Sequence, residues 1–451
     1  MTATNHLVEL AQDVVKRALD AGATDAECTI AEGDEFSANV RMREIENLKE
    51  AGSRGLGLRI LVGKKTGSSY TSDLSEEGVA QLLKSAIELA DITTDDPHAG
   101  LPEAEELGSL PGDLGLYSPD IEKLETPVKI DAATRAEDAA LSADPRIFNS
   151  EGASFDNHVG RHIFANSRGF AGEYRSSYCS LSTVPVARDG ESMERDYWYS
   201  MARSFAGLED PEYIGRTAAL RALRRLNAKK VETRKRPVVF EPRTARTLLD
   251  SIFDAVHGMS IYRHESFLAG KLGEKVAGDN VTIIDDGTIP GLFGTSPFDD
   301  EGVPSRRTVV IDKGVLKSYL LNSYAARKLG LKTTGNASRG LAGNAGIGHG
   351  NFFIEKGVQS PDQILAGISD GFYVTELMGF GVNIVTGDYS RGAAGLWIRN
   401  GELTFAVSEV TIAGNLKEML MNVEAIGSDL EFRGSEAAPT LKIGEMTVGG
   451  L

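Results

Sequence analysis

Cysteine is scarce in this chain of 451 residues, where only Cys28 and Cys179 occur. Two cysteines are too few for a disulfide framework, and they lack the CxxC spacing of a structural zinc site, so we expect both to be small buried residues. Long apolar runs are also missing, because no stretch reaches the roughly 18 residues that span a bilayer. Residues 1–21 lack the apolar block of a signal peptide. We therefore expect a cytoplasmic protein that does not enter a membrane.

Basic residues are outnumbered, since 48 Lys and Arg stand against 65 Asp and Glu and leave a net charge of -17. A surface this negative repels a phosphate backbone, so direct nucleic-acid binding is not expected. The basic stretch at 229–236 is interpreted as a solvated helix end and linker.

Two common catalytic and phosphate-binding motifs are absent: there is no HExxH helix and no GK[ST] loop. The Gly-rich run 340–350 leads into an expected strand at 351–354 and opens no helix, which argues against a dinucleotide site. We interpret this run as a mobile loop or a close crossing of strands. The acidic stretch 299–302 lacks the alternating ligands of a calcium loop and is interpreted as a solvated turn.

Glycine is abundant, with 50 residues against 15 prolines. The glycines are spread through alternating apolar runs, which predicts many hairpins and close-packed strands. The predicted fold class is α+β, with an amino-terminal α/β region built on an antiparallel sheet and a carboxy-terminal β-rich, barrel-like domain with a few helices. We expect domains at 1–118 and 232–451, joined by a middle α+β segment at 119–231.

Periodicity and turn residues predict the individual elements. An antiparallel meander is expected at 25–72, with a turn at 63–65, and short strands are expected between 147 and 204. Further tight turns are expected at 285–287, 312–314 and 400–401. Apolar spacing and capping residues, among them Asp73, Asp210, Ser360 and Asn415, predict helices at about 7–21, 76–90, 129–142, 211–229, 242–259, 361–371 and 416–426.

Seven histidines offer imidazole groups for catalysis or metal binding. His158 and His162 lie four residues apart in a strand-and-turn region, where this spacing does not bring two rings together. His257, His264 and Glu265 follow a helix, and two imidazoles with a carboxylate could hold zinc. The competing interpretation is a histidine at a helix end, favoured by the helix dipole and followed by a loop.

Five ordered runs in the later half carry a family likeness, at 268–276, 300–304, 314–320, 386–388 and 410–415. With them the chain resembles the TldD/PmbA family of bacterial metallopeptidases, and within it the PmbA branch, also called TldE. The resemblance implies a heterodimer in which a TldD subunit holds zinc with the two histidines of an HExxxH helix and a later cysteine. This chain departs from that pattern, because the helix before 268–276 offers at most His257 and the stretch 429–439 contains no cysteine.

The resemblance therefore implies the subunit without metal of a cytoplasmic TldD-type metallopeptidase, with zinc in the partner and unfolded peptides as substrate. We expect no catalytic residue and no cofactor in this chain, and a homodimer when it is alone. An older family label, modulator of DNA gyrase, suggests contact with DNA, which the net charge disfavours. Two alternatives stay open: an autonomous metal-dependent hydrolase using His257, His264 and Glu265, and a regulatory binding protein outside any peptidase.

A peptide-binding cleft is expected in the β-rich domain, because extended peptides are commonly held by backbone pairing along an exposed strand. The predicted lining consists of small residues in and after the Gly-rich run and of one later turn: Gly346, Gly348, Asn351, Thr386, Gly387 and Asp388. The competing interpretation is that these residues only turn the sheet.

We predict that the chain purified alone binds no stoichiometric zinc, because the HExxxH helix and the later cysteine are missing. Elemental analysis after desalting measures this. About one zinc per chain, lost on His257→Ala or His264→Ala, would instead support the autonomous hydrolase.

Overall fold

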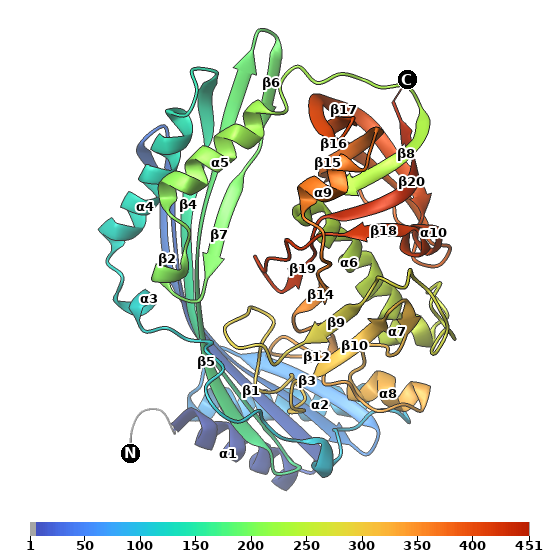
Figure 1. The fold of residues 1–451 in the computed structure, drawn as a ribbon. Coiled ribbons are helices and arrows are strands. Elements are labelled where there is room, and N and C mark those ends of the chain that lie inside the picture. Colours follow the sequence, from blue (N-terminus) through green and yellow to red (C-terminus); the bar gives the residue numbers. More distant parts are fainter. Residues whose placement is uncertain (1–5, 451) are drawn as a thin grey trace.

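The chain folds into two parts that face each other, as the computed structural model shows for residues 6–450 (Figure 1). One part is a long curved antiparallel sheet, and the other contains a small closed barrel on the concave side of that sheet. The predicted α+β class and the barrel-like carboxy-terminal domain are confirmed. Within the described residues, no helix has the length and apolar character needed to cross a membrane.

The curved sheet joins the first two segments of the chain, because β1 pairs with β2 on one side and with β4 on the other. The turn at 63–65 is confirmed by the pairing of Val62 with Lys65. The strands after residue 147 are not short as expected, since they are long enough to pass beneath two successive helix layers. The strands are β1 (Asp25–Arg41), β2 (Glu44–Val62), β3 (Lys65–Thr71), β4 (Ile147–Asn166), β5 (Ala171–Asp189), β6 (Ser192–Arg195) and β7 (Trp198–Ala202), in the order β3-β2-β1-β4-β5-β6 with β7 also on β5.

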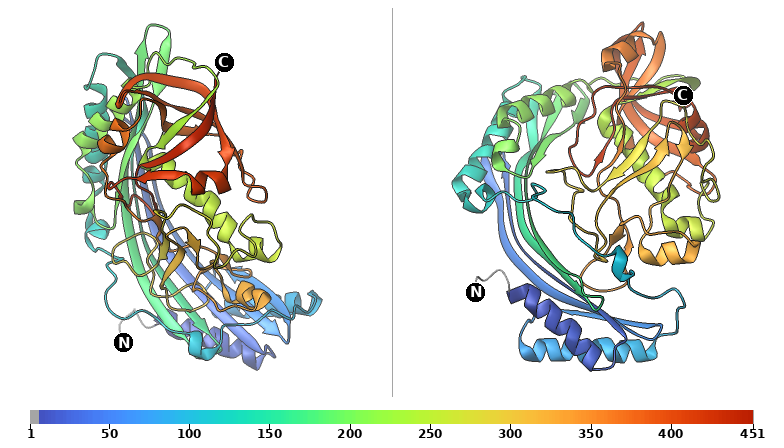
Figure 2. Two further views of the ribbon diagram at one scale, coloured as in Figure 1. Left: turned by 45° about the vertical axis from the view of Figure 1, so that its right-hand side comes forward. Right: turned by 60° about the horizontal axis from the view of Figure 1, so that its bottom comes forward.

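Helices cover the convex face of this sheet in two groups (Figure 2). The first pair packs on its lower half and the second pair on its upper half, each over a separate apolar core. Cys28 and Cys179 lie buried and unpaired in these cores, as expected. The helices are α1 (His6–Asp20), α2 (Glu76–Ile92), α3 (Asp120–Lys123), α4 (Thr126–Leu141) and α5 (Pro211–Leu223).

Capping explains where these helices begin. Ser75 caps α2 by accepting a hydrogen bond from the Gly78 N–H, so the expected cap at Asp73 is wrong; Asp73 instead accepts from the Ser75 N–H. Asp210 caps α5 as predicted, through the Tyr213 N–H, but α5 ends at Leu223, before the expected end near residue 229. The start of α2 is therefore marked by Ser75, whose hydroxyl accepts a hydrogen bond from the backbone three residues later, and not by Asp73 further upstream.

The concave face of the sheet is polar. Along β4 and β5, residues that are buried under the helices alternate with residues that are only partly buried on the other face. This alternation is typical of an antiparallel sheet with one covered face and one solvated face. The concave side is therefore an accessible, hydrophilic wall.

The carboxy-terminal part contains a closed five-stranded barrel, since the ring β17-β16-β15-β8-β20 is completed by pairing between β17 and β20. The turn at 400–401 is confirmed, with left-handed φ values of 49° at Asn400 and 85° at Gly401. The barrel strands are β8 (Arg234–Phe240), β15 (Asp370–Met378), β16 (Asp388–Arg399), β17 (Glu402–Asn415) and β20 (Leu441–Gly449), and β18 (Val423–Ile426) adds to β20 from outside.

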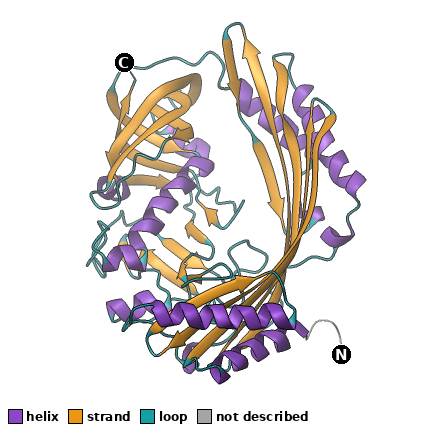
Figure 3. Cartoon of the chain, turned by 180° about the vertical axis from the view of Figure 1, so that it is seen from behind, coloured by secondary structure: helices purple, strands orange, loops and turns teal. Residues whose placement is uncertain are grey.

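A second, five-stranded sheet lies between the barrel and the curved sheet (Figure 3). The turn at 312–314 is confirmed, but the turn at 285–287 is wrong, because Asp285 and Asp286 belong to a strand and the chain then makes a long excursion through 287–306. The strands are β9 (Ile283–Asp286), β10 (Arg307–Asp312), β11 (Val315–Leu316), β14 (Phe352–Ile354) and β19 (Glu436–Ala437), in the order β11-β10-β9-β14-β19.

Five helices accompany these sheets, and the three expected ones are present. Ser360 and Asn415 cap two of them as predicted. The short helices at 258–262 and 323–329 were not expected, because each has fewer than two turns and shows no apolar periodicity in the sequence. The helices are α6 (Pro242–Val256), α7 (Gly258–Tyr262), α8 (Ser323–Leu329), α9 (Pro361–Ala366) and α10 (Leu416–Met421).

The Gly-rich run after residue 338 docks on the inner face of the curved sheet. Arg339 forms an ion pair with Glu27 of β1, whose side chain is 1% exposed, and Arg59 of β2 holds the same carboxylate at 2.8 Å. Asn344 accepts a hydrogen bond of 2.8 Å from Arg59 Nε. Leu341 lies so close that a Cβ atom on Gly57 would stand 1.4 Å from its carbonyl oxygen. The run is therefore the close crossing that the glycines predicted.

We predict that Gly57→Ala separates this run from the sheet, because a backbone carbonyl cannot move aside as a flexible side chain can. Overpacking of this kind should lower the free energy of unfolding by about 3 kcal/mol. Gly340→Ala is the matched control, since the space around Gly340 is open, and it should change stability by about 0.5 kcal/mol or less. Urea denaturation measures both, and equal stabilities would contradict the docking.

Candidate functional site

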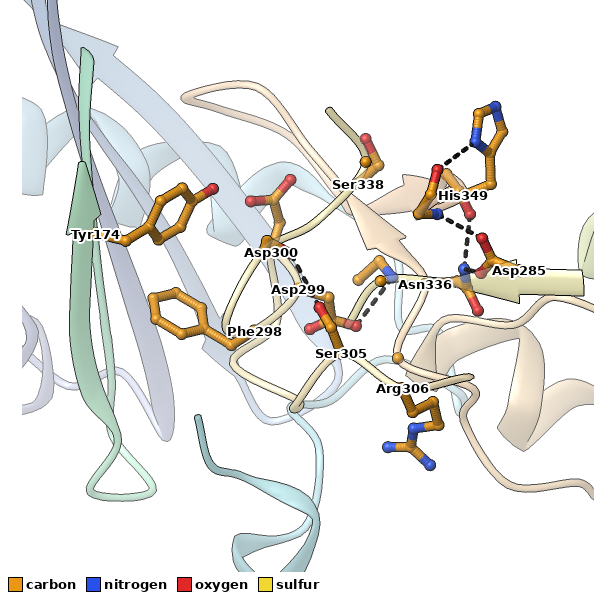
Figure 4. Close-up of a pocket in the computed structure, with 17 residues that line it drawn as sticks. Tyr174, Asp285, Phe298, Asp299, Asp300, Ser305, Arg306, Asn336, Ser338 and His349 are labelled. Atoms are coloured by element: carbon orange, nitrogen blue, oxygen red, sulfur yellow. Dashed lines mark hydrogen bonds between the residues drawn. The ribbon is translucent and has the colours of Figure 1, made fainter. Parts of the chain in front are cut away.

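A polar cavity of about 140 Å³ lies where the curved sheet meets the second sheet (Figure 4). Tyr174 of β5 and Phe298 form one side, while Asp285 and His349 lie at the other. Five glycines also line the cavity, which lets backbone approach it closely: Gly287, Gly294, Gly335, Gly348 and Gly350. The cavity thus combines carboxylates, an imidazole and exposed backbone.

Asp285 is a buried, firmly held carboxylate of the cavity. It lies at the end of β9, is 3% exposed, and accepts hydrogen bonds of 2.7 Å from the Gly350 N–H and from Asn336 Nδ2. Burial raises the pKa of Asp285 to about 6 in spite of these donors. This carboxyl group can therefore exchange a proton close to neutral pH.

Asp299 and Glu301 form a buried acidic pair, so the interpretation of 299–302 as a solvated turn is wrong. Asp299 accepts backbone hydrogen bonds of 2.9 Å from Glu301, Val303 and Ala337. Glu301 accepts from the N–H and the hydroxyl of Ser323, at the start of α8. Burial, together with the neighbouring Glu301, raises the pKa of Asp299 to about 8, and burial raises the pKa of Glu301 too. The pair holds the loop 287–306 against α8.

The curved sheet contributes an imidazole to the same region. His162 of β4 places Nε2 3.5 Å from Oδ1 of Asp300, and its ring packs 5.2 Å from that of Tyr174. Burial lowers the pKa of His162, although Asp300 acts in the opposite direction. His162 is therefore neutral at physiological pH. His158, the other member of the spaced pair, contacts Tyr178 instead, so the two rings stay apart as expected.

His349 connects the cavity with helix α6. Its Nδ1 lies 2.9 Å from the Gly350 carbonyl, and its Nε2 lies 3.2 Å from Oε1 of Glu436 in β19. Burial opposes protonation, but the hydrogen bonds to Glu436 and the Gly350 carbonyl outweigh it and raise the pKa of His349. Glu436 also hydrogen-bonds with Asp250 of α6. A chain of titratable groups thus runs from the cavity to α6.

Helix α6 presents Asp250 and Asp254, whose i, i+4 spacing places both carboxylates on one face of the helix. Local desolvation and the Glu436 carboxylate raise the pKa of Asp250 to about 6, and desolvation also raises the pKa of Asp254. Among residues 6–450, no three His, Cys, Asp or Glu side chains come together in an arrangement that could hold a metal ion. The donor set on this face is therefore not one that fits a catalytic zinc.

The three alternative metal ligands have other surroundings. His257 accepts a hydrogen bond of 3.3 Å from the Met259 N–H at the start of α7, and its ring packs on Phe253. His264 occupies a left-handed position with φ of 58°. Glu265 is exposed and lies 3.8 Å from Arg263. The structure does not group the three into a ligand set.

The predicted cleft residues are distributed over two places. Gly348 lines the cavity, and Gly346 precedes it in β13 (Gly346–Ile347), which pairs with β12 (Ala337–Ser338). Asn351 is fully buried, and its side-chain amide bonds to the Asp286 carbonyl, Thr295 and the Gly294 N–H. Its side chain is therefore not free to reach a peptide.

The other predicted residues, Thr386, Gly387 and Asp388, belong to a turn at the start of β16 and do not line the cavity. Thr386 donates a hydrogen bond of 2.7 Å to Asp388, and Asn415 donates one of 3.2 Å to the same carboxylate. This closed pattern turns the sheet, which is the competing interpretation given above.

The sequence did not single out three titratable residues of this region, which are Asp285, Glu436 and Asp250. Asp285 could have been found as an acidic residue that ends an apolar strand, but the following Gly287 suggested a turn. Glu436 meets His349 only because β14 and β19 pair in parallel across more than eighty residues of chain. No local pattern indicates such a pairing.

Known families match the chain in three successive parts. The PmbA/TldA metallopeptidase domain 1 matches residues 26–90, the central domain matches residues 119–226, and the C-terminal domain matches residues 233–450. Together they span most of the chain.

Individual relatives agree with these matches. The chain is 38% identical to metalloprotease PmbA of Escherichia coli O157:H7 over 98% of its own length and 96% of that protein. A crystal structure of a putative modulator of DNA gyrase from Bacteroides thetaiotaomicron is similar with a TM-score of 0.91 and 31% identity, over 98% of both chains. TldE from Thermococcus kodakarensis shares the fold, with a TM-score of 0.86 and 22% identity over 98% of this chain and all of that one.

We predict that Asp299 makes the protein less stable as the pH rises. Its pKa is raised in the folded state, so the folded chain holds a proton that the unfolded chain releases above its ordinary pKa near 3.8. The stabilisation is complete at low pH and is lost as the pH approaches about 8. Between pH 5 and 7.5 the wild type should lose about 1.4 kcal/mol per pH unit more than Asp299→Asn.

Urea denaturation at several pH values measures this difference. Asp279→Asn, which removes a carboxylate whose side chain is 83% exposed, controls for the change in net charge and should keep the slope of the wild type. Equal slopes for the wild type and Asp299→Asn would show that Asp299 is ionised in the folded state.

Proposed function

Because the chain belongs to the PmbA/TldE branch of the PmbA/TldD metallopeptidase family, we propose that it is the non-metal-binding subunit of a TldD/TldE-type complex that processes unfolded peptides. The observation that carries the proposal is an accessible polar wall facing a carboxy-terminal part whose described residues form no zinc ligand set. The chain then shapes the space in which a peptide is held, and a TldD-type partner supplies the zinc and the hydrolysis.

The concave wall has the chemistry expected for holding an unfolded chain. Its partly buried positions on β5 are mostly small hydroxyl residues and a tyrosine: Ser176, Tyr178, Ser180 and Ser182. Such side chains offer hydrogen bonds in either direction and exclude no particular peptide side chain. A wall of this kind supports binding of many sequences in preference to one.

The curvature of the sheet supports a role as half of a chamber. The long strands bend around the side where the second sheet lies, while helices α1, α2, α4 and α5 lie on the outer, convex side (Figures 1 and 2). A second chain with a similar curved sheet, placed against the concave side of this one, would enclose the space between the two chains. We propose a TldD-type subunit as that chain in the cytoplasm, and a second copy of this chain when the partner is absent.

The absence of a ligand set divides the chemistry between the two chains. In the family pattern the glutamate of the HExxxH helix is the general base, and helix α6 of this chain contains neither a histidine nor a glutamate. Peptide hydrolysis by water needs an activated nucleophile. The partner therefore carries the catalytic step, and this chain contributes binding and enclosure.

Direct binding to DNA is not part of the proposal. Relatives carry the label of a modulator of DNA gyrase, but a net charge of -17 opposes contact with a phosphate backbone.

We predict that peptidase activity on an unfolded peptide appears only when this chain is mixed with a TldD-type subunit. Each chain alone should be inactive, because one lacks the zinc ligands and the other lacks half of the chamber. A chelator should abolish the activity of the mixture. Turnover of a fluorogenic unstructured peptide measures all of these.

Two matched variants assign the chemistry to a chain. Replacing the glutamate of the partner's HExxxH helix by glutamine should silence the mixture, whereas Glu265→Gln in this chain should leave most of the rate. The reverse result would place catalysis in this chain.

A further inference from the structure

A second cavity, of about 100 Å³, lies where the upper half of the curved sheet meets the start of α6. Trp198 and Tyr199 of β7 form the side that belongs to the curved sheet. Residues of α6 and of the stretch around β19 form the opposite side, and Figure 1 shows these three elements facing one another. Four arginines line the cavity: Arg221, Arg243, Arg246 and Arg433.

Three of these arginines already have carboxylate partners. Arg221 lies 2.5 Å from Oε1 of Glu241, Arg243 lies 3.3 Å from Oδ1 of Asp196, and Arg433 lies 2.8 Å from Oε1 of Glu209. Their charges are therefore neutralised by the protein itself. Such pairs fix the walls of the cavity and leave little capacity to bind a ligand.

Arg246 differs from the other three. Its side chain is partly buried near the start of α6, yet it makes no hydrogen bond or ion pair with any residue between 6 and 450. Asp250, one turn further along, is influenced by its charge but lies outside ion-pair distance. The guanidinium of Arg246 is therefore still reached by water and has its donors available for an acceptor on a ligand.

The neighbouring carboxylates are engaged elsewhere. Glu431 lies 2.9 Å from Arg433, and Glu436 lies 3.2 Å from His349. The Trp198 ring is held in place by Arg433, whose guanidinium carbon lies 4.4 Å from the ring centre, and by a hydrogen bond of 3.0 Å to Glu209. The cavity is thus rigid, and Arg246 is its one arginine without an acceptor in the described chain.

We propose that this cavity is a subsite for a carboxylate group of the peptide, held by Arg246 beside the Trp198 ring. The proposal rests on the function proposed above, since the peptide reaches the cavity along the concave wall that ends at β7. A planar guanidinium matches a carboxylate with two parallel hydrogen bonds. The free volume has room for only a few water-sized groups, which suits a carboxylate and not a whole residue.

Two parts of a peptide carry this chemistry, the terminal carboxylate and the side chain of Asp or Glu. Three unstructured ten-residue peptides of Gly, Ser and Ala separate them. The first has a free carboxy terminus, the second is amidated, and the third is amidated but carries a central glutamate. Turnover by this chain assembled with its TldD-type partner gives KM and kcat for each peptide.

Arg246→Gln should raise KM about tenfold for the peptide whose carboxylate enters the cavity, because one charge-assisted contact is lost. Its kcat and the turnover of the neutral amidated peptide should stay unchanged. Arg246→Lys should recover part of the loss, and Arg216→Gln, at an exposed position of α5, controls for net charge. An equal change for all three peptides, or no change for any, would overturn the proposal.

A direct binding measurement separates this proposal from the function on which it rests. Only Trp198 and Trp397 occur in the sequence, so Trp397→Phe leaves Trp198 as the reporter inside the cavity. Its fluorescence should change on adding the carboxylate peptide to the isolated chain, and Arg246→Gln should abolish that change. An inactive mixture with intact Arg246-dependent binding would refute only the peptidase role, whereas binding that ignores Arg246→Gln would refute the subsite.

Discussion

The buried ion pairs of Glu27 hold the two halves of the molecule in register. Glu27 lies on the curved sheet, and its carboxylate joins Arg59 of the same sheet to Arg339 of the carboxy-terminal part. Removing one member of this group would leave an unpaired charge in the interior, which strongly lowers the stability of the folded state. The position of the Gly-rich run, and with it Gly348 and His349, therefore depends on this contact.

The cavity beside this contact continues into a group of titratable side chains on helix α6. Helix α6 directs Asp250 and Asp254, which are four residues apart, to the same face. Glu436 raises the pKa of Asp250 on this face and lies 3.2 Å from Nε2 of His349. The result is a run of proton-exchanging groups from His349 to α6, in which the pKa values of His349 and Asp250 are both raised.

The sequence predicted the parts of the fold that depend on local periodicity. The helices of the first half, the hairpin at residue 63 and the barrel turn at Asn400 follow from neighbouring residues. The buried pair of Asp299 and Glu301 could not be found in this way, since acidic residues in succession are usually solvated and only the packing of α8 removes them from water.

The candidate site was predicted only in outline. The Gly-rich run was recognised as a place of close backbone approach, and Gly348 does line the cavity. Arg246, Trp198 and His349 were not recognised, because each acquires its surroundings from elements far away in the chain. Contacts of this kind carry no spacing that a single sequence reveals.

The closure of the barrel has a consequence for synthesis on the ribosome. Strand β8 begins at Arg234, but its ring is completed only by β20, which ends at Gly449 and pairs with both β8 and β17. The curved sheet, in contrast, uses strands that have all emerged by Ala202. The amino-terminal half can therefore fold while the remainder is being translated, whereas the barrel must wait until β20 has left the ribosome. Nascent chains will expose barrel edges during that interval.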